Sequence, residues 1–365
     1  MRYKDLYLKS IEIIRKNQSN YGLYIASPNF NNYKYCWLRD STFIAYSMDL
    51  CGNNSSSRKY YCGINDILKV RSKKVEQLID TYNKSGFIDK KNILPARFSL
   101  EGKITGTDWP EFQIDGYGIF LWGLVKHLEI TGELNLLETT FKDSIDIVVK
   151  YLTNFWNVPN YDCWEENGDR INTSTIVCVY GGLKSILGTK KDKIITDSCD
   201  KIKTFFHNFC VKNNHIIKYI GAELVDSSLL WCSVPFGIVD AEDYIMLNTV
   251  EKIESLLSKT GLKRYYMDEY YGGGEWPLLT AFLGWYYLTI GNIRGARKML
   301  KLVLKSADKN YMLPEQTPFN LYFPEKYYFW KNKWGEIAKP LLWSHAMYVI
   351  IYCLLQRERN IKNDS

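Results

Sequence analysis

The chain has 365 residues, of which 46% are hydrophobic and 24% are charged, a balance typical of a soluble globular protein with a large core. Its net charge of +7 comes from scattered residues, and the one compact basic cluster, at 71–74, is too short to predict a nucleic-acid-binding face. The nine cysteines include no CxxC pair, so neither a disulfide framework nor a zinc site is expected, and a reducing cytoplasm fits best.

No membrane segment is expected. The most apolar stretch, 341–355, is broken by Ser344 and His345 and is too short to cross a bilayer, and the amino terminus lacks the apolar run of a signal peptide. Aromatic residues make up 15% of the chain, with 28 Tyr and 11 Trp. Exposed rings with polar tips suit concave binding sites, and sugars present apolar C–H faces to such rings, so this composition permits a carbohydrate-binding cleft.

Helical periodicity dominates the chain from its first residues. Asp115 and Asn172 precede apolar runs as helix starts do, and Gly132, Gly261 and Gly291 stand where helices would end. The apolar spacing predicts helices around 6–14, 40–51, 65–83, 115–131, 135–154, 172–187, 191–212, 225–235, 242–259, 276–290, 293–308 and 341–356. Signals for β-structure are short, the clearest being a hairpin strand at 215–220.

About twelve helices without a linker between halves favour one all-α domain over residues 1–365. Six helical hairpins would close into an (α/α)6 toroid, in which outer helices surround an inner ring that fills the middle. A solenoid of helical repeats is the alternative, but no sequence period is visible. Polar and aromatic loops precede the expected inner helices and would converge at one end of the toroid, where we expect a binding site. These loops are 33–40, 106–116, 161–172, 264–276 and 312–340.

Glu165 is the first candidate catalytic carboxylate, within the segment YDCWEE at 161–166. A carboxylic acid beside an indole ring such as Trp164, ahead of a helix, can have its ionised form desolvated and its pKa raised, as a general acid needs. The alternative is an ordinary pair of acids at a helix start, where negative charge interacts favourably with the helix dipole.

Glu315 is the second candidate carboxylate, within LPEQ at 313–316. Pro314 would hold the preceding backbone extended, and Gln316 could steady a carboxylate or a water molecule. Because the two glutamates are far apart in the chain, they can meet only through the fold. Hydrolysis of a glycosidic bond requires such a pair of carboxyl groups.

Two loops carry an arginine beside an acid and resemble clamps for sugar hydroxyls. In WLRD at 37–40, Arg39 offers a planar donor next to the acceptor Asp40, and Arg264 begins RYYMD ahead of YYGGGEWP at 270–277. A structural ion pair is the alternative for each arginine. The three glycines do not form a phosphate loop, because no GK[ST] follows them.

The remaining candidates are weaker. Trp109 could stack on a ligand, and Trp343 opens the last helix next to His345, which could be a switchable acid or simply a satisfied buried histidine. The four histidines lack metal-ligand spacing, and neither HExxH nor GxSxG occurs. No metal or cofactor is therefore expected.

Six stretches together resemble the glucoamylase-like glycoside hydrolases of family 15. They are YKYCWLRDS (33–41), QIDGYG (113–118), CWEENGDR (163–170), LKRYYMDEYYGGGEWPLLTAFLGWYY (262–287), LPEQ (313–316) and PLLWSHA (340–346). They occur in the family's order and extend from residue 33 almost to the carboxyl end. The resemblance implies an (α/α)6 barrel that releases β-glucose from the non-reducing end of an α-glucoside, with inversion and without a metal.

The resemblance also implies roles for individual residues. Glu165 matches the general acid and Glu315 the general base that activates water. Arg39 and Asp40 match residues that grip the non-reducing glucose, and Tyr33, Trp37 and Trp343 match the walls around that sugar. Trp164, Glu166 and Arg264 match residues beside the acid or toward the aglycone, where Trp109 resembles a stacking platform.

We expect the chain to lack the amino-terminal β-sandwich and the starch-binding module that many relatives carry, a departure from the family. We therefore expect a short oligosaccharide or disaccharide rather than starch as the partner, and an exposed interface could promote a homo-oligomer. The family also contains trehalases and glucodextranases, so a trehalase using the same glutamates is one alternative. A non-catalytic carbohydrate-binding or regulatory barrel is another.

Overall fold

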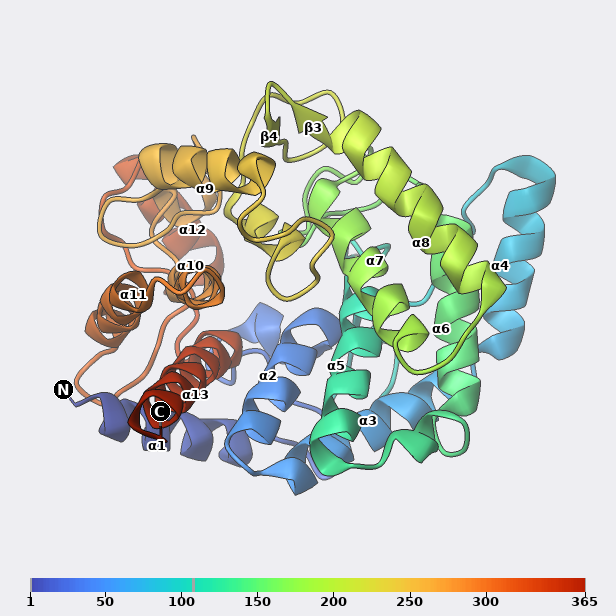
Figure 1. The fold of residues 1–365 in the computed structure, drawn as a ribbon, viewed down its shortest axis with the longest axis horizontal. Helices are drawn as coiled ribbons and strands as arrows, with labels where there is room; N and C mark the ends of the chain where they lie inside the picture. The colour runs from blue at the N-terminus through green and yellow to red at the C-terminus, as the bar shows by residue number, and fades with distance from the viewer. Residues whose placement is uncertain (1, 107–108, 365) are drawn as a thin grey trace.

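The computed structural model describes residues 2–106 and 109–364, so Thr107 and Asp108 of the expected loop 106–116 lie outside the described residues. Its helices form two concentric rings, seen down the axis in Figure 1. The inner ring consists of α2 (Leu38–Leu50), α5 (Asp115–Thr131), α7 (Thr173–Leu187), the 3-10 helix η4 (Ser227–Cys232), α10 (Pro277–Thr289) and α13 (Leu342–Asp364). The outer ring consists of α1 (Tyr3–Lys16), α3 (Asn54–Lys69), α6 (Lys142–Phe155), α8 (Lys193–Phe205), α9 (Tyr244–Leu257) and α11 (Ile293–Ser306).

The inner ring closes on itself. Each of its elements packs against the next, from α2 through α5, α7, η4 and α10 to α13, and α13 packs against α2. All thirteen residues of α2 are buried, and η4 is buried throughout. A helix without a polar face is stable only where it is surrounded by protein, whereas the outer helices bury one stripe and expose the rest. The predicted (α/α)6 toroid is confirmed.

Two glycines let neighbouring inner helices touch. A Cβ at Gly118 of α5 would lie 2.2 Å from the carbonyl oxygen of Cys178, and a Cβ at Gly182 of α7 would lie 2.3 Å from the oxygen of Gly118. Because both contacts are with backbone atoms, a methyl group would push the helices apart. The two glycines therefore allow α5 and α7 to pack backbone against backbone.

Several predicted elements have different limits in the structure, and the helix expected at 135–154 is the 3-10 helix η2 (Leu134–Leu137) followed by α6. The helix expected at 65–83 is two helices, α3 and α4 (Ser72–Ser85), separated by a turn at 70–71; both pack on α6, and α3 also packs on α2 and α5. The helix expected at 191–212 is α8, continued by the π-helical segment η3 (Phe206–Cys210), and the chain then enters the hairpin β3 (Val211–Lys212) and β4 (His215–Ile216). The helix expected at 225–235 is the short η4.

A further helix, α12 (Pro324–Trp334), lies within 312–340, which was expected to be a loop. Every side chain of α12 is at least partly exposed, so its sequence has no apolar stripe of the usual kind. Its start signals are proline at the first position, where the missing N–H costs nothing, and Glu325 in the first turn.

None of the described helices is long and apolar enough to cross a membrane. All nine cysteines are free thiols.

Candidate active site

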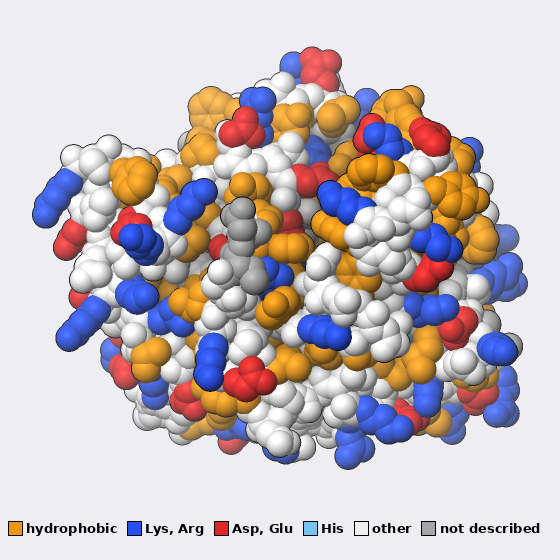
Figure 2. Space-filling view, turned by 180° about the vertical axis from the view of Figure 1, so that it is seen from behind, with side chains coloured by type: hydrophobic (Ala, Val, Ile, Leu, Met, Phe, Trp, Pro, Cys, Tyr) orange, Lys and Arg blue, Asp and Glu red, His pale blue; other side chains and the backbone are white. Residues whose placement is uncertain are grey.

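The inner helices begin at one end of the toroid, and a cavity of about 650 Å³ opens there. Figure 2 shows this face, where hydrophobic, acidic and basic side chains gather around a central hollow. All five loops expected at this end contribute to the lining, which confirms their predicted convergence. The eleven predicted site residues all line the cavity: Tyr33, Trp37, Arg39, Asp40, Trp109, Trp164, Glu165, Glu166, Arg264, Glu315 and Trp343.

Glu165 is held by two N–H donors that bind the same oxygen. Its Oε1 accepts hydrogen bonds from Trp37 Nε1 at 2.6 Å and from Gln113 Nε2 at 3.0 Å. The residue adopts φ 67°, a left-handed conformation that is uncommon outside glycine and is held here by the surrounding loop. Asp162 stabilises that loop by accepting from the backbone N–H groups of Trp164 and Glu166, both at 2.9 Å. The second oxygen, Oε2, is therefore the one left available to a ligand.

Glu315 is only 2% exposed and contacts Tyr33 through one oxygen. Tyr33 donates to Oε1 at 2.8 Å, whereas Oε2 is buried without a hydrogen-bond partner among the described residues. Burial raises the pKa of Glu315 to about 7, against the opposing effects of the Tyr33 hydrogen bond and the charge of Arg264. A buried oxygen without a partner suggests a place for a water molecule, since leaving it unsatisfied is costly.

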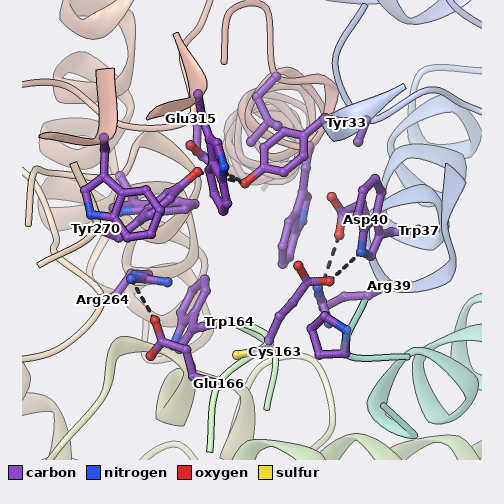
Figure 3. Close-up of a pocket in the computed structure, with 18 of the residues that line it drawn as sticks. Tyr33, Trp37, Arg39, Asp40, Cys163, Trp164, Glu166, Arg264, Tyr270 and Glu315 are labelled. Carbon is purple, nitrogen blue, oxygen red and sulfur yellow. Dashed lines mark hydrogen bonds and ion pairs between the residues drawn. The ribbon is translucent and has the colours of Figure 1, made fainter. Parts of the chain in front are cut away.

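One short segment touches both carboxylates. Tyr33 binds Glu315, and Trp37, four residues later, binds Glu165, while the Tyr33 and Trp37 rings meet edge to face at 5.6 Å. The segment is fixed by pairing of β1 (Cys36–Trp37) with β2 (Arg97–Phe98). Figure 3 shows Tyr33 beside Glu315 and Trp37 on another side of the pocket.

Arg39 and Asp40 lie at the buried floor of the cavity. Arg39 Nη1 donates to Gln113 Oε1 and to Asp115 Oδ2, both at 2.9 Å, and its Nε is 3.5 Å from Asp40 Oδ1. Burial raises the pKa of Asp40 to about 7, although the charge of Arg39 opposes this. The arginine is therefore also part of a structural ion-pair network, the alternative considered from the sequence, while still facing the cavity.

Arg264 forms a second buried network. It donates to both carboxylate oxygens of Asp268, at 2.8 and 2.6 Å, and to Glu166 Oε1 at 3.2 Å. Glu166 also accepts from the hydroxyl of Tyr265 at 2.7 Å. In Figure 3 Arg264 and Glu166 lie together on the side of the pocket away from Tyr33. The two residues thus present a fixed, polar surface to a ligand.

The ring that contacts Glu165 is not the one next to it in the chain. Trp164 directs its Nε1 to Asp226 at 2.9 Å, and the indole N–H that binds Glu165 belongs to Trp37. Trp343 stacks on Phe43 at 5.7 Å and forms part of the cavity floor. Trp109 lies under the guanidinium of Arg97, 4.0 Å from its ring centroid.

Aromatic contacts surround most of the cavity, and several of their members were missed from the sequence. A chain of ring contacts between 4.6 and 6.4 Å joins Trp109, Trp37, Tyr33, Phe30, Trp334, Trp330, Tyr270, Trp276 and Trp164. Tyr270 and Trp276 belong to the glycine-rich segment 270–277, but they were not among the predicted site residues. Trp330 and Trp334 were not predicted because their helix, α12, was expected to be a loop.

His345 is a satisfied buried histidine, not a switch. It hydrogen-bonds Ser10 Oγ through Nδ1 at 2.8 Å and accepts from the backbone N–H of Leu313 through Nε2 at 3.0 Å. Burial lowers its pKa to about 3, so the ring is neutral at ordinary pH. Among the described residues no group of three or more His, Cys, Asp or Glu side chains could hold a metal ion.

Comparison with known proteins identifies the family. The model of glycosyl hydrolases family 15 matches residues 1–352. The chain belongs to this family. It is thus a family-15 glycoside hydrolase, as the motifs implied.

Individual relatives of this family-15 hydrolase agree along nearly the whole chain. An isomaltose glucohydrolase from Kribbella flavida is 34% identical over 96% of this chain and 92% of its own. A glycosidase variant solved in complex with glucose superposes with a TM-score of 0.92 at 32% identity and covers 97% of both chains. The glucoamylase from Saccharomycopsis fibuligera shares the fold, with a TM-score of 0.73 at 16% identity, over 97% of this chain and 95% of its own.

Proposed function

We propose that this family-15 hydrolase removes glucose from the non-reducing end of a short α-glucoside with inversion, using Glu165 as general acid and Glu315 as general base. One observation carries the proposal. Two carboxylates from distant parts of the chain line one cavity, and each has one oxygen bound by protein and one left over. Glycoside hydrolysis by inversion needs one carboxylic acid at the leaving oxygen and one carboxylate at the attacking water.

The oxygens without a protein partner, Oε2 of Glu165 and Oε2 of Glu315, indicate a different role for each residue. Because Glu165 Oε1 already accepts two N–H groups, the proton for the glycosidic oxygen belongs on Oε2. Glu315 Oε2 would accept a proton from the water that attacks the anomeric carbon from the opposite face. Arg39 and Asp40 offer a donor and an acceptor to hydroxyls of the terminal glucose at the floor.

The closed floor favours cleavage at a chain end. Trp343 stacks on Phe43 and lies 6.2 Å from Trp231, so the middle of the toroid is filled by rings. A cavity with such a floor admits the end of a sugar chain and cannot let a polymer pass through. This shape supports exo-acting hydrolysis.

Isomaltose is the substrate that we favour, because the relative from Kribbella flavida is an isomaltose glucohydrolase and aligns with almost the whole chain. A panel of isomaltose, maltose, trehalose and maltodextrins tests this. We expect the highest kcat/KM for isomaltose. Fastest turnover of trehalose would favour a trehalase instead, and sugar binding without any turnover would favour a non-catalytic barrel.

The pH dependence of activity should reveal Glu315, because a general base acts in its ionised form. Its pKa of about 7 predicts that the acid limb of the pH profile, where kcat/KM rises with pH, lies in that region. Replacing Tyr33 with Phe removes a hydrogen bond that stabilises the carboxylate, so the pKa should rise and the acid limb should move to higher pH. A pH–rate profile measures this, and an unchanged or downward-shifted limb would contradict it.

A further inference from the structure

Helix α12 carries an unusual surface for a short exposed helix. Five of its eleven residues are aromatic, and every side chain is at least partly exposed. Two of the five, Trp330 and Trp334, are one helical turn apart and line the cavity. Their rings contact each other at 4.8 Å. Exposed aromatic surface at a pocket is characteristic of a binding site.

The helix is tied to the rim of the cavity at both ends. Trp330 Nε1 donates to the backbone oxygen of Glu269 at 3.1 Å, and Lys326 forms an ion pair with the carboxylate of Glu269 at 2.7 Å. At the other end, the hydroxyl of Tyr271 donates to the oxygen of Gly335 at 2.8 Å. These contacts hold the two indoles in place, so a ligand would meet a prearranged surface.

The burial of the lining residues separates the floor of the cavity from its mouth. Arg39, Trp343 and Glu315 are at most 5% exposed, whereas Met267 is 47% exposed and Glu269 is also exposed. Trp330 and Trp334 line the cavity and are partly exposed, so they lie nearer to solvent than the buried residues of the floor.

A single residue, Tyr270, connects the indole of Trp330 to the residues around Glu315. Trp330 contacts Tyr270 at 5.2 Å, the hydroxyl of Tyr270 is 3.0 Å from that of Tyr33, and Tyr33 binds Glu315. A glucoside that enters with its terminal glucose first, as the proposed function requires, leaves its second sugar between the carboxylates and the mouth. Trp330 and Trp334, which line the cavity and are partly exposed, are placed to contact that second sugar.

We propose that Trp330 and Trp334 form the binding surface for the aglycone sugar and thereby determine which short α-glucosides are used. The inference rests on the proposed function. The apolar C–H face of a glucosyl residue packs against indole rings, and burying these faces together supplies affinity that depends on the aglycone and not on the reacting bond. Trp109, whose contacts are with Trp37 and Arg97, would face the same sugar from another part of the mouth.

Two substrates that differ only in the leaving group test the inference. Isomaltose has a sugar aglycone, whereas α-glucosyl fluoride has none. In Trp330→Ala and Trp334→Ala we expect kcat/KM for isomaltose to fall by about tenfold or more, mainly through KM, while the value for α-glucosyl fluoride stays within about twofold. Trp334→Phe should recover part of the loss, because a flat ring is restored.

Tyr328→Ala is the matched control, since Tyr328 is on the same helix, is 64% exposed and does not line the cavity. This variant should keep wild-type values for both substrates. Equal losses for both substrates in the tryptophan variants, or no loss for isomaltose, would overturn the inference while the proposed function stands. Wild-type protein that leaves α-glucosyl fluoride and isomaltose intact would instead contradict the proposed function, and the inference with it.

Discussion

Replacing Glu315 with glutamine is expected to lower kcat/KM for isomaltose by roughly 10²–10⁴-fold, the usual contribution of a general base. The amide cannot accept the proton of the attacking water, although its oxygen can still accept the hydrogen bond from Tyr33. Because the side-chain shape and that hydrogen bond are retained, the fold should be unaffected. Thermal unfolding measured beside the kinetics separates loss of chemistry from loss of structure.

A nucleophile that needs no deprotonation should bypass the missing base. In Glu315→Ala, azide ions can occupy the space left by the carboxylate and attack the anomeric carbon, so β-glucosyl azide is the expected product. Glu325→Gln, which changes an exposed carboxylate of α12, is the charge-matched control and should keep full activity. Near-normal turnover of isomaltose by Glu315→Gln would show that another residue is the base.

Replacing Glu165 with glutamine should have an effect that depends on the leaving group. The amide oxygen can accept from Trp37 and Gln113 as Oε1 does, but the group cannot donate a proton to the glycosidic oxygen. Turnover of isomaltose, whose sugar alkoxide is a poor leaving group, should therefore fall by roughly 10²–10⁴-fold. Turnover of α-glucosyl fluoride should fall far less, because fluoride leaves with little acid assistance.

The comparison of the two substrates in one variant is the measurement. A general acid predicts a large gap between them, while a residue that only shapes the pocket predicts similar losses. Equal losses for isomaltose and α-glucosyl fluoride in Glu165→Gln would therefore contradict the role of Glu165. In Glu315→Gln, kcat/KM should fall for both substrates, because the base is needed whatever the leaving group.

Most of the inner ring was predictable because helices such as α5, α7 and α10 are apolar on nearly every side. Runs such as 115–131 and 172–187 have start and stop signals at the right places, and the structure places α5 and α7 there. The limits of η4 were harder to predict, since a buried 3-10 helix of six residues has too few turns to show a hydrophobic period. α12 had no apolar stripe, because its rings point toward a pocket and solvent and not into the core.

The membership of the site was predictable from loops, but its contacts were not. Periodicity showed which loops precede inner helices, and the family motifs within them selected residues that all line one cavity. Neighbours in sequence are not neighbours in space, however. Glu165 follows Trp164 in the chain, yet its indole partner is Trp37 of β1, whereas Trp164 binds Asp226.

The central claim is that Glu165 and Glu315 act on opposite faces of one α-glucosidic bond. Proton NMR of the first glucose released from isomaltose tests it most directly, because the two anomers give separate signals before they interconvert. Inversion predicts that β-glucose appears first and that α-glucose grows in later by mutarotation. Initial release of α-glucose would contradict the account.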